Sequence, residues 1–197
     1  MGNKFSEIAF TDDVKSAQET SGSRSSYARM EDRADTNHLL GPTEAAFIAA
    51  RDSFYMATVS QTGWPYVQHR GGPAGFVRVL DETSLGFADF RGNRQYISVG
   101  NLVKEDRVSL FFMDYPNRTR LKLLGRARAV ELDDTATLEK LELPDYRSRV
   151  ERGIVIKVEG FDWNCPQHIT PRFTSADIAD AVQPLHQRIA ELEARVK

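Results

Sequence analysis

The sequence predicts a mainly β protein with peripheral helices, whose strands form an antiparallel barrel or sandwich. Six or seven short stretches are rich in β-branched and aromatic residues, turn signals separate them, and only short helical segments interrupt them. A parallel doubly wound sheet would need longer helices between its strands. The 197 residues, 41% of them hydrophobic, are enough for one sizeable core.

The expected elements begin after the break at Gly41, where a short helix is predicted. A strand at residues 54–60 and a strand at residues 64–70 are joined by the turn Gln61-Thr62-Gly63, which predicts a hairpin. Further strands are predicted at residues 76–80, 84–88, 107–113, 121–131 and 154–161.

The closing segment is predicted to form a helix that begins near Ser175. Its apolar residues recur at steps of three and four and form a seam about two heptads long. The seam either packs on the helix's own barrel or also meets a partner subunit, and the sequence favours neither alternative. The seam consists of Val182, Leu185, Ile189, Leu192 and Val196.

The chain divides by composition into three segments. Residues 12–37 are polar with few large apolar side chains, so residues 1–40 are expected to form an arm, either ordered or loose. Residues 41–162 carry the strand patterns of the central domain, and residues 163–197 form a C-terminal loop and helix.

Charge and composition narrow the class of protein. The 26 basic and 28 acidic residues give a net charge of -2, which argues against nucleic-acid binding. No apolar run reaches the roughly 20 residues of a membrane span. The single cysteine, Cys165, cannot form an intramolecular disulfide, so a cytoplasmic protein is expected.

A polar turn is the first candidate site. In the stretch FADFRGNRQYISVGNL, Gly92 permits an unusual backbone angle and Asn93 is a strong N-cap for a helix over residues 95–103. Amide groups at that helix start, with Arg94 and Gln95, would bind a phosphate. From this stretch alone, a solvated capping turn with surface salt bridges is an equal alternative.

A second donor-rich cluster lies at Gln68-His69-Arg70, before a loop with three glycines that would let a flat ligand approach the backbone. A third donor, Lys122, is expected on a strand where alternation places it on the same face as Leu124 and Arg126. Together these clusters favour an anion site.

Four motifs follow one another along the chain: MATVSQTGWPYVQHRGG, LGFADFRGNRQYISVGNL, RVSLFFMD and LKLLGRARAVE. Their order resembles the pyridoxamine 5'-phosphate oxidase-like family, the FMN-binding split β-barrels, from Thr43 to Phe161. The resemblance implies a six-stranded antiparallel split barrel. It also implies a homodimer with one FMN in each of two clefts between the subunits.

The resemblance also implies which residues hold the cofactor. The turn matches the family's phosphate-gripping turn, and the cluster at 68–70 matches the strand that lines the flavin and its phosphate. The backbone beside the turn would run along the flavin, and the C-terminal segment would close on the flavin of the partner. The implied FMN-binding residues are Gln68, His69, Arg70, Ala88, Asp89, Gly92, Asn93, Arg94, Gln95, Lys122, Trp163, Gln167 and Arg172.

The function implied is that of an FMN-dependent oxidoreductase, in which NAD(P)H reduces the flavin and the flavin passes electrons to a small substrate. No catalytic side chain is required, and no metal-ligand spacing is present. The family's Arg-x-His substrate pair is not reproduced, since His168 precedes Arg172, so pyridoxamine phosphate is not the expected substrate. Two alternatives stay open: a non-catalytic FMN-binding, storage or sensor protein, and a split barrel that binds haem or a deazaflavin instead.

Overall fold

The computed structural model describes residues 3–31, 36–163 and 166–196. They fall into two compact units. The barrel unit comprises residues 1–113 and 120–164, and the C-terminal unit comprises residues 114–119 and 165–197.

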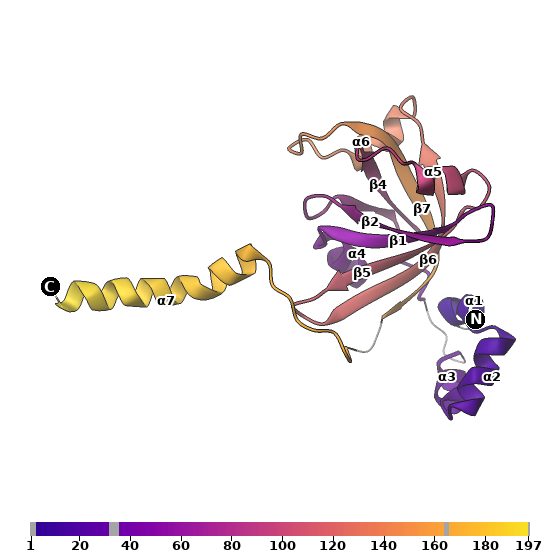
Figure 1. The fold of residues 1–197 in the computed structure, drawn as a ribbon, viewed down its shortest axis with the longest axis horizontal. Helices are drawn as coiled ribbons and strands as arrows, with labels where there is room; N and C mark the ends of the chain where they lie inside the picture. The colour runs from indigo at the N-terminus through magenta and orange to yellow at the C-terminus, as the bar shows by residue number, and fades with distance from the viewer. Residues whose placement is uncertain (1–2, 32–35, 164–165, 197) are drawn as a thin grey trace. The chain divides into compact units, whose positions relative to one another are not determined.

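Seven strands form one antiparallel sheet in the order β2-β1-β5-β6-β7-β4-β3 (Figure 1). The fold class predicted from the sequence is confirmed, as a mainly antiparallel open sheet consistent with a split barrel. The count is seven, one more than the six strands that the family resemblance implies. The strands are β1 (Ser53–Val59), β2 (Pro65–Gly71), β3 (Val77–Asp81), β4 (Ser84–Phe90), β5 (Arg107–Asp114), β6 (Thr119–Val130) and β7 (Val150–Trp163).

The hairpin expected between the first two strands is present. β1 and β2 pair from Ser53 opposite Gly71 to Val59 opposite Pro65. Gly63 closes the turn with a φ of +81°, and its N–H donates to the carbonyl of Ser60 at 2.9 Å. Glycine suits this position because other residues are strained in the left-handed region.

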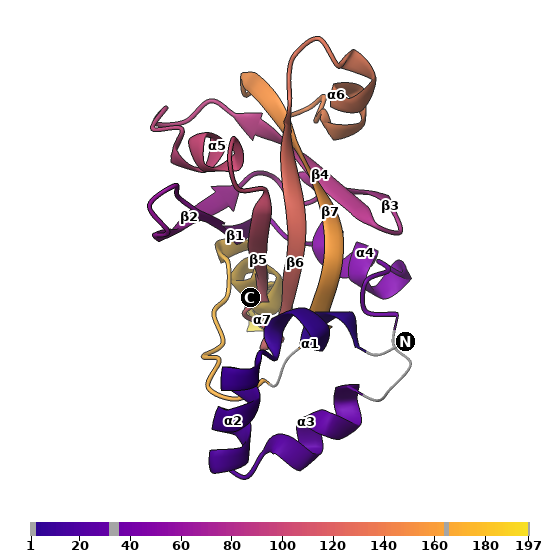
Figure 2. The same ribbon diagram turned by 90° about the vertical axis from the view of Figure 1, so that its right-hand side faces the viewer.

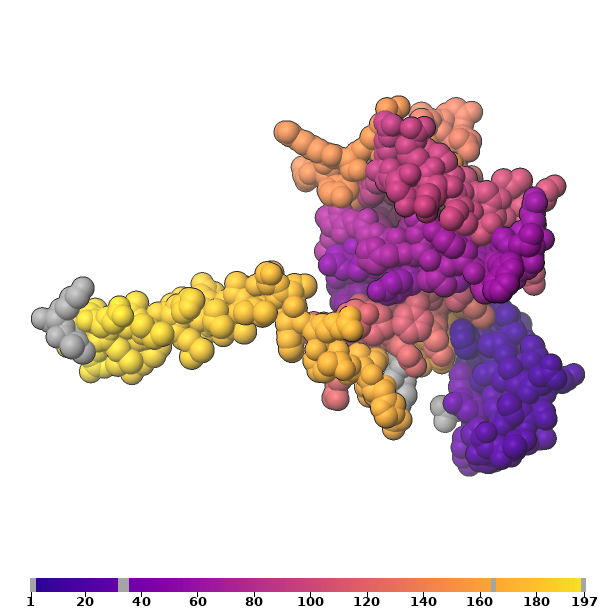
Figure 3. All heavy atoms as spheres, viewed as in Figure 1, coloured from indigo at the N-terminus to yellow at the C-terminus, as the bar shows by residue number. Residues whose placement is uncertain are grey.

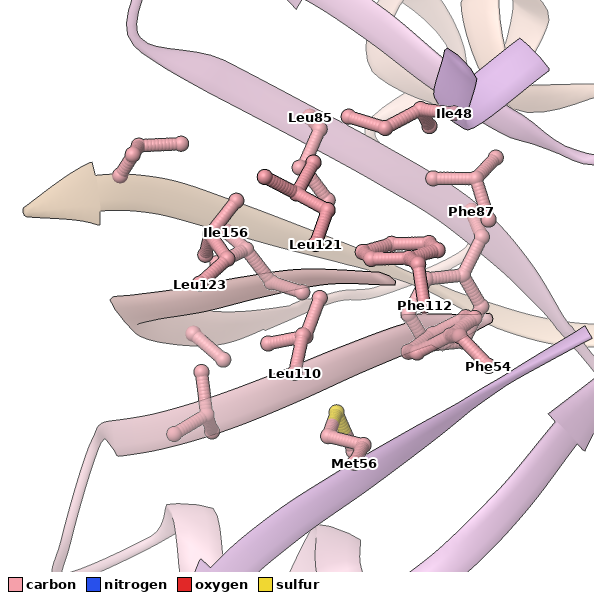
Figure 4. Packing of buried hydrophobic residues seen from close by; sticks show 14 of the residues in the cluster. Ile48, Phe54, Met56, Leu85, Phe87, Leu110, Phe112, Leu121, Leu123 and Ile156 are labelled. Atoms are coloured by element: carbon pink, nitrogen blue, oxygen red, sulfur yellow. The ribbon is translucent and has the colours of Figure 1, made fainter. Parts of the chain in front are cut away.

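Aliphatic side chains and phenylalanine rings together fill the core of the sheet (Figure 4). Phe54 stacks on Phe112, with ring centroids 4.9 Å apart, and meets Phe87 edge-on at 5.3 Å. These three side chains are fully buried, and each contributes about 1.5–3 kcal/mol through burial. The core therefore provides a rigid floor beneath the strand ends that carry the polar clusters.

Seven helices are described, and most of them lie at the edges of the sheet. α1 contacts one end of β7, and α6 packs at the other end (Figure 2). None of the helices in the described part of the chain combines the length and apolar character of a membrane span. The helices are α1 (Lys4–Ala9), α2 (Asp12–Thr20), α3 (Arg24–Glu31), α4 (Pro42–Ala49), α5 (Ile97–Leu102), α6 (Thr135–Leu141) and α7 (Ser175–Val196).

The described part of the arm before residue 36 contains the helices α1, α2 and α3, and α1 docks on β7. Phe5 lies against Gly160, where an added Cβ would come within 2.8 Å of the Phe5 amide nitrogen. Asn37 fixes the same place, since its side-chain amide donates to the carbonyl of Phe161 at 2.8 Å. The described residues Phe5 and Asn37 therefore both contact the C-terminal end of β7.

Candidate functional site

A polar cavity lies where the ends of β2 and β4 meet the start of β7. Its volume is about 200 Å³. A neighbouring cavity of about 280 Å³ shares several of its residues and extends along β2 and β4 toward Phe76, Phe87 and Tyr146. We call the first one the arginine cavity; it is lined by Gln68, Arg70, Asp89, Phe90, Gly92, Asn93, Arg94, Tyr96, Val99 and Glu151.

A buried ion-pair cluster forms the inner wall of the arginine cavity. Arg70 Nη1 donates to Asp89 Oδ1 at 2.6 Å, and Arg152 Nε lies 3.5 Å from Asp89 Oδ2. Strand alternation explains the first contact, because Gln68 and Arg70 face inward from β2 while His69 faces outward. The Arg70 guanidinium also lies over the Phe87 ring, 5.8 Å from its centroid, so the core supports its position.

Arg70 keeps an unused donor, and Arg152 uses its Nε only in the 3.5 Å ion pair with Asp89 Oδ2. The Nε groups of Arg70 and Arg152 are buried and have no hydrogen-bond partner among the described residues. A buried donor without an acceptor costs about 1–3 kcal/mol, and such groups are rare in folded proteins. The cluster therefore has capacity for a further acceptor.

Burial is the main influence on the carboxyl at the centre. It raises the pKa of Asp89 above its ordinary value of 3.8, although the positive charges of Arg70 and Arg152 act in the opposite direction. Asp89 consequently offsets less positive charge than a fully exposed carboxylate would as the pH falls.

A second cluster forms the outer rim of the cavity. Arg94 Nε donates to the Tyr96 hydroxyl at 3.1 Å, and that hydroxyl donates to Glu151 Oε1 at 3.2 Å. Arg91 lies on the other side of Glu151, with 3.9 Å between Arg91 Nε and Glu151 Oε1. Four arginines, at 70, 91, 94 and 152, therefore surround two carboxylates, at 89 and 151, which leaves an excess of positive charge that suits an anion.

α5 holds the turn over the sheet by two hydrogen bonds. Ser98 Oγ donates to Gln68 Oε1 at 3.0 Å, and Asn101 Nδ2 donates to Thr58 Oγ1 at 2.9 Å. Figure 3 shows the pink-magenta surface of the turn and α5 directly above the purple surface of β1 and β2. The rim and the inner wall are therefore fixed relative to each other.

The turn itself differs from the prediction. α5 begins at Ile97 rather than at Gln95, with Tyr96 as the N-cap residue. Asn93 Oδ1 accepts from the amide of Gln95 at 3.2 Å, so Asn93 closes a local Asx turn instead of capping the helix.

Gly92 also plays a different part from the one expected. The left-handed residues of the turn are Arg94, with φ of +61°, and Tyr96, with φ of +54°, while Gly92 is not in that region. Holding non-glycine residues there costs about 1–2 kcal/mol each. The strain is stored in the two residues that carry the rim hydrogen bond, which is a pattern typical of functional turns.

The structure gathers most of the predicted site residues. Gln68, Arg70, Asp89, Gly92, Asn93 and Arg94 line the arginine cavity. His69 and Ala88 line the neighbouring cavity. Gln95 is exposed beside the turn and lines neither cavity.

Two predicted residues of the barrel unit lie elsewhere. Lys122 pairs with Asp162 at 2.6 Å across β6 and β7, and its ammonium group lies 5.0 Å from the centroid of the Phe5 ring. Trp163 donates its indole N–H to Glu44 Oε1 at 2.9 Å and packs edge-on against Phe47. Neither side chain lines the two cavities.

The remaining predicted residues belong to the C-terminal unit. The Arg172 guanidinium lies over the Tyr115 ring, 4.8 Å from its centroid, and Gln167 is exposed. Cys165 lies outside the described residues.

The sequence reasoning missed four residues that line the cavity and one that pairs with Asp89. They are Phe90, Tyr96, Val99, Glu151 and Arg152. The last two lie in RSRVERG, a polar stretch that precedes the predicted strand at 154–161. β7 in fact begins at Val150. Their charge was the available signal, but only strand pairing brings Asp89 opposite Arg152.

An open antiparallel sheet with an arginine-lined cavity at its strand ends is typical of the split-barrel class. The family model described as pyridoxamine 5'-phosphate oxidase matches residues 40–160. This is well over half of the chain, so the protein belongs to that family. Members of the family are typically dimeric.

Solved structures agree with the fold. HupZ from Group A Streptococcus superimposes with a TM-score of 0.51 at 16% identity, covering 68% of this chain and 99% of its own. A protein from Lactobacillus delbrueckii, provisionally assigned as a pyridoxamine 5'-phosphate oxidase, gives 0.50 at 21% identity, covering 64% and 96%. Identities this low bear on the fold alone. A search of curated proteins returned no match.

Proposed function

We propose that this protein is an FMN-dependent oxidoreductase that transfers hydride or electrons to a small substrate other than pyridoxamine phosphate. The proposal rests on family membership and, above all, on one observation: the buried Nε of Arg70, which lines the arginine cavity, has no hydrogen-bond partner among the described residues, and Arg94 rims the same cavity. Such a site suits the 5'-phosphate of FMN.

The residues present fit a phosphate group. A phosphate monoester carries about -1.5 to -2 charges at neutral pH and three strong acceptor oxygens. The arginine cavity offers the guanidinium groups of Arg70 and Arg94, donors of the planar kind that bind phosphate in pairs. Asn93 and Gln68 add neutral polar groups to the lining.

The neighbouring cavity supports the placement of the rest of the cofactor. It continues from the arginine cavity between β2 and β4 and is lined by Phe76, Phe87 and the backbone strand around Ala88. Its mixed apolar and polar lining suits a flavin and its ribityl chain. In the proposed homodimer a partner subunit completes the cleft around the flavin.

Bound FMN would supply the redox chemistry, because the flavin accepts and donates hydride. The chain's own residues bind and orient. Arg70 and Arg94 would hold the phosphate, and Arg152 would support the Asp89 carboxylate that pairs with Arg70. Ser98 would keep Gln68 in place, and Phe87 would exclude water from the floor. NAD(P)H is the proposed electron donor, and no catalytic side chain is assigned.

The visible absorption spectrum tests this proposal. The purified protein is incubated with FMN, desalted and then mixed anaerobically with NADPH or NADH. Flavin bands that survive desalting and bleach with nicotinamide would support a reductase. Bands that survive without bleaching by either nucleotide would favour an FMN-binding, storage or sensor protein, and loss of the bands would contradict FMN as the cofactor.

A further inference from the structure

α7 carries a heptad pattern that the proposed function does not use. Its apolar residues follow one another at steps of four and three over residues 178–196. This spacing defines the a and d positions of a coiled coil. The d positions are Ile178, Leu185 and Leu192, and the a positions are Val182, Ile189 and Val196.

This apolar stripe is open to solvent over most of its length. The exposed fractions are 62% for Leu185, 53% for Ile189 and 45% for Leu192. Ile178, about two turns before Leu185, is also exposed. Four large apolar side chains aligned on one exposed helix face indicate a surface that binds a partner.

The residue types at the seam specify the partner's geometry. The a positions are all β-branched, and two of the three d positions are leucine. β-branched residues at a with leucine at d favour two parallel helices. Pro184 occupies a c position, away from the seam, so its ring does not enter the interface.

Charge identifies that partner as a second copy of the chain. Arg188 occupies a g position and Glu193 the following e position. In a parallel, in-register pair each g residue faces the next e residue of the other helix, so two Arg188–Glu193 ion pairs form between the copies. In an antiparallel pair g residues face each other, and Arg188 would lie opposite arginine.

The contact that Arg188 makes within its own helix does not compete strongly. Arg188 Nη1 lies 2.8 Å from Glu191 Oε2, but both side chains are more than half exposed. Exposed pairs of this kind contribute little. Arg188 is therefore available to a facing helix.

We propose that α7 from two copies of this protein forms a parallel, in-register two-stranded coiled coil. Fewer than three heptads are marginal for free helices. The coiled coil therefore depends on the homodimer of the proposed function. That dimer would hold the two helices at high effective concentration. The coiled coil would add a second interface to that dimer.

Cysteine cross-linking of the full chain tests the pairing. In a Cys165→Ser background, Val182→Cys places a thiol at an a position with little change in volume, and Gln187→Cys places one at f, on the opposite face. Under mild oxidation, Val182→Cys should form a covalent dimer at least about tenfold faster than Gln187→Cys. Equal rates, or no covalent dimer with Val182→Cys, would overturn the proposal.

Charge reversal tests the orientation. In the Val182→Cys background, Arg188→Glu would place like charges opposite each other and should slow cross-linking roughly fivefold. Adding Glu193→Arg to the same chain should restore the rate. Failure of the double variant to restore it would overturn the parallel register.

An FMN titration of the same variants separates this proposal from the proposed function. Seam variants that lose cross-linking and keep FMN affinity leave the flavin site standing, as the proposal predicts. Cross-linking at the a position in a protein that binds no FMN would support the coiled coil while contradicting the flavin function.

Discussion

Arg70 Nη1 lies 2.6 Å from Asp89 Oδ1, and this contact joins β2, at one end of the sheet order, to β4, beside the other end. The curvature of the sheet is what brings these strands together. The pair lies at the wall of the arginine cavity, where Arg152 from β7 shares the same carboxylate. Three strands thus contribute charge to a single site.

Arg94→Ala should weaken FMN binding about tenfold or more, because it removes a charged donor from the cavity rim without touching the core. Isothermal titration with FMN measures this effect. Arg126→Ala is the matched control, since Arg126 is an exposed, ion-paired arginine that does not line the cavity. Equal FMN affinities of the two variants would remove the turn from the site.

Tyr96→Phe should weaken FMN binding roughly threefold, because Arg94 loses the hydroxyl that positions its guanidinium. The thermal midpoint should change little, since the hydroxyl is on the surface. Tyr55→Phe, on the outward face of β1, should alter neither property. A loss of affinity in both variants, or in neither, would contradict a positioning role for Tyr96.

Asp89→Asn should change how stability depends on pH. A carboxyl whose pKa is raised on folding stabilises the fold when protonated, and this contribution is lost as the pH rises through the folded-state pKa. The asparagine cannot titrate. We define the difference as the free energy of unfolding of the variant minus that of the wild type. From about pH 4 to 7, this difference should therefore become more positive, by up to about 1.4 kcal/mol for each unit of pKa difference.

Asp81→Asn provides the opposite sign. Hydrogen bonds from Thr83, the backbone amide first, lower the pKa of Asp81, so its contribution is present above the unfolded-state pKa and is lost as the pH falls. For Asp81→Asn, the free energy of unfolding of the variant minus that of the wild type should then become more negative as the pH rises. Urea unfolding across the pH series measures both slopes, and identical slopes would refute the assignment for Asp89.

Gly125→Ala should destabilise the fold by about 1–3 kcal/mol. An added Cβ would lie 2.5 Å from the Lys157 carbonyl oxygen, at the register shift between β6 and β7. Gly92→Ala is the control: its Cβ would meet no atom within 4 Å, so stability should stay within about 0.5 kcal/mol. Comparable losses in the two variants would contradict the described backbone of the turn.

The strands could be predicted because their pattern is local. The aromatic and β-branched residues of β1 and the apolar residues of β5 and β6 can be recognised in the sequence. Each predicted strand lies within a few residues of an observed one. The start of α7 at Ser175 was predicted from heptad spacing for the same reason. The helix α6 was not predicted, because its seven residues make only about two turns, which is too short for an apolar periodicity to be recognised.

Only part of the site could be predicted from the sequence. The donors at 68–70 and 91–95 stand out by composition, but Arg152 and Glu151 enter the site through pairing with β4, which no local pattern encodes. Lys122, in contrast, was predicted as a site residue and lies elsewhere. Its charge suggested a ligand contact, whereas its register places it opposite Asp162.

The central claim is that the arginine cavity binds the phosphate of FMN, and a comparison of FMN with riboflavin tests it most directly. Both ligands carry the same ring, and only FMN carries the phosphate. The wild type should bind FMN at least about a hundredfold more tightly than riboflavin, and Arg94→Ala should reduce that ratio about tenfold while leaving riboflavin affinity unchanged. Equal affinities for FMN and riboflavin in the wild type would contradict the account.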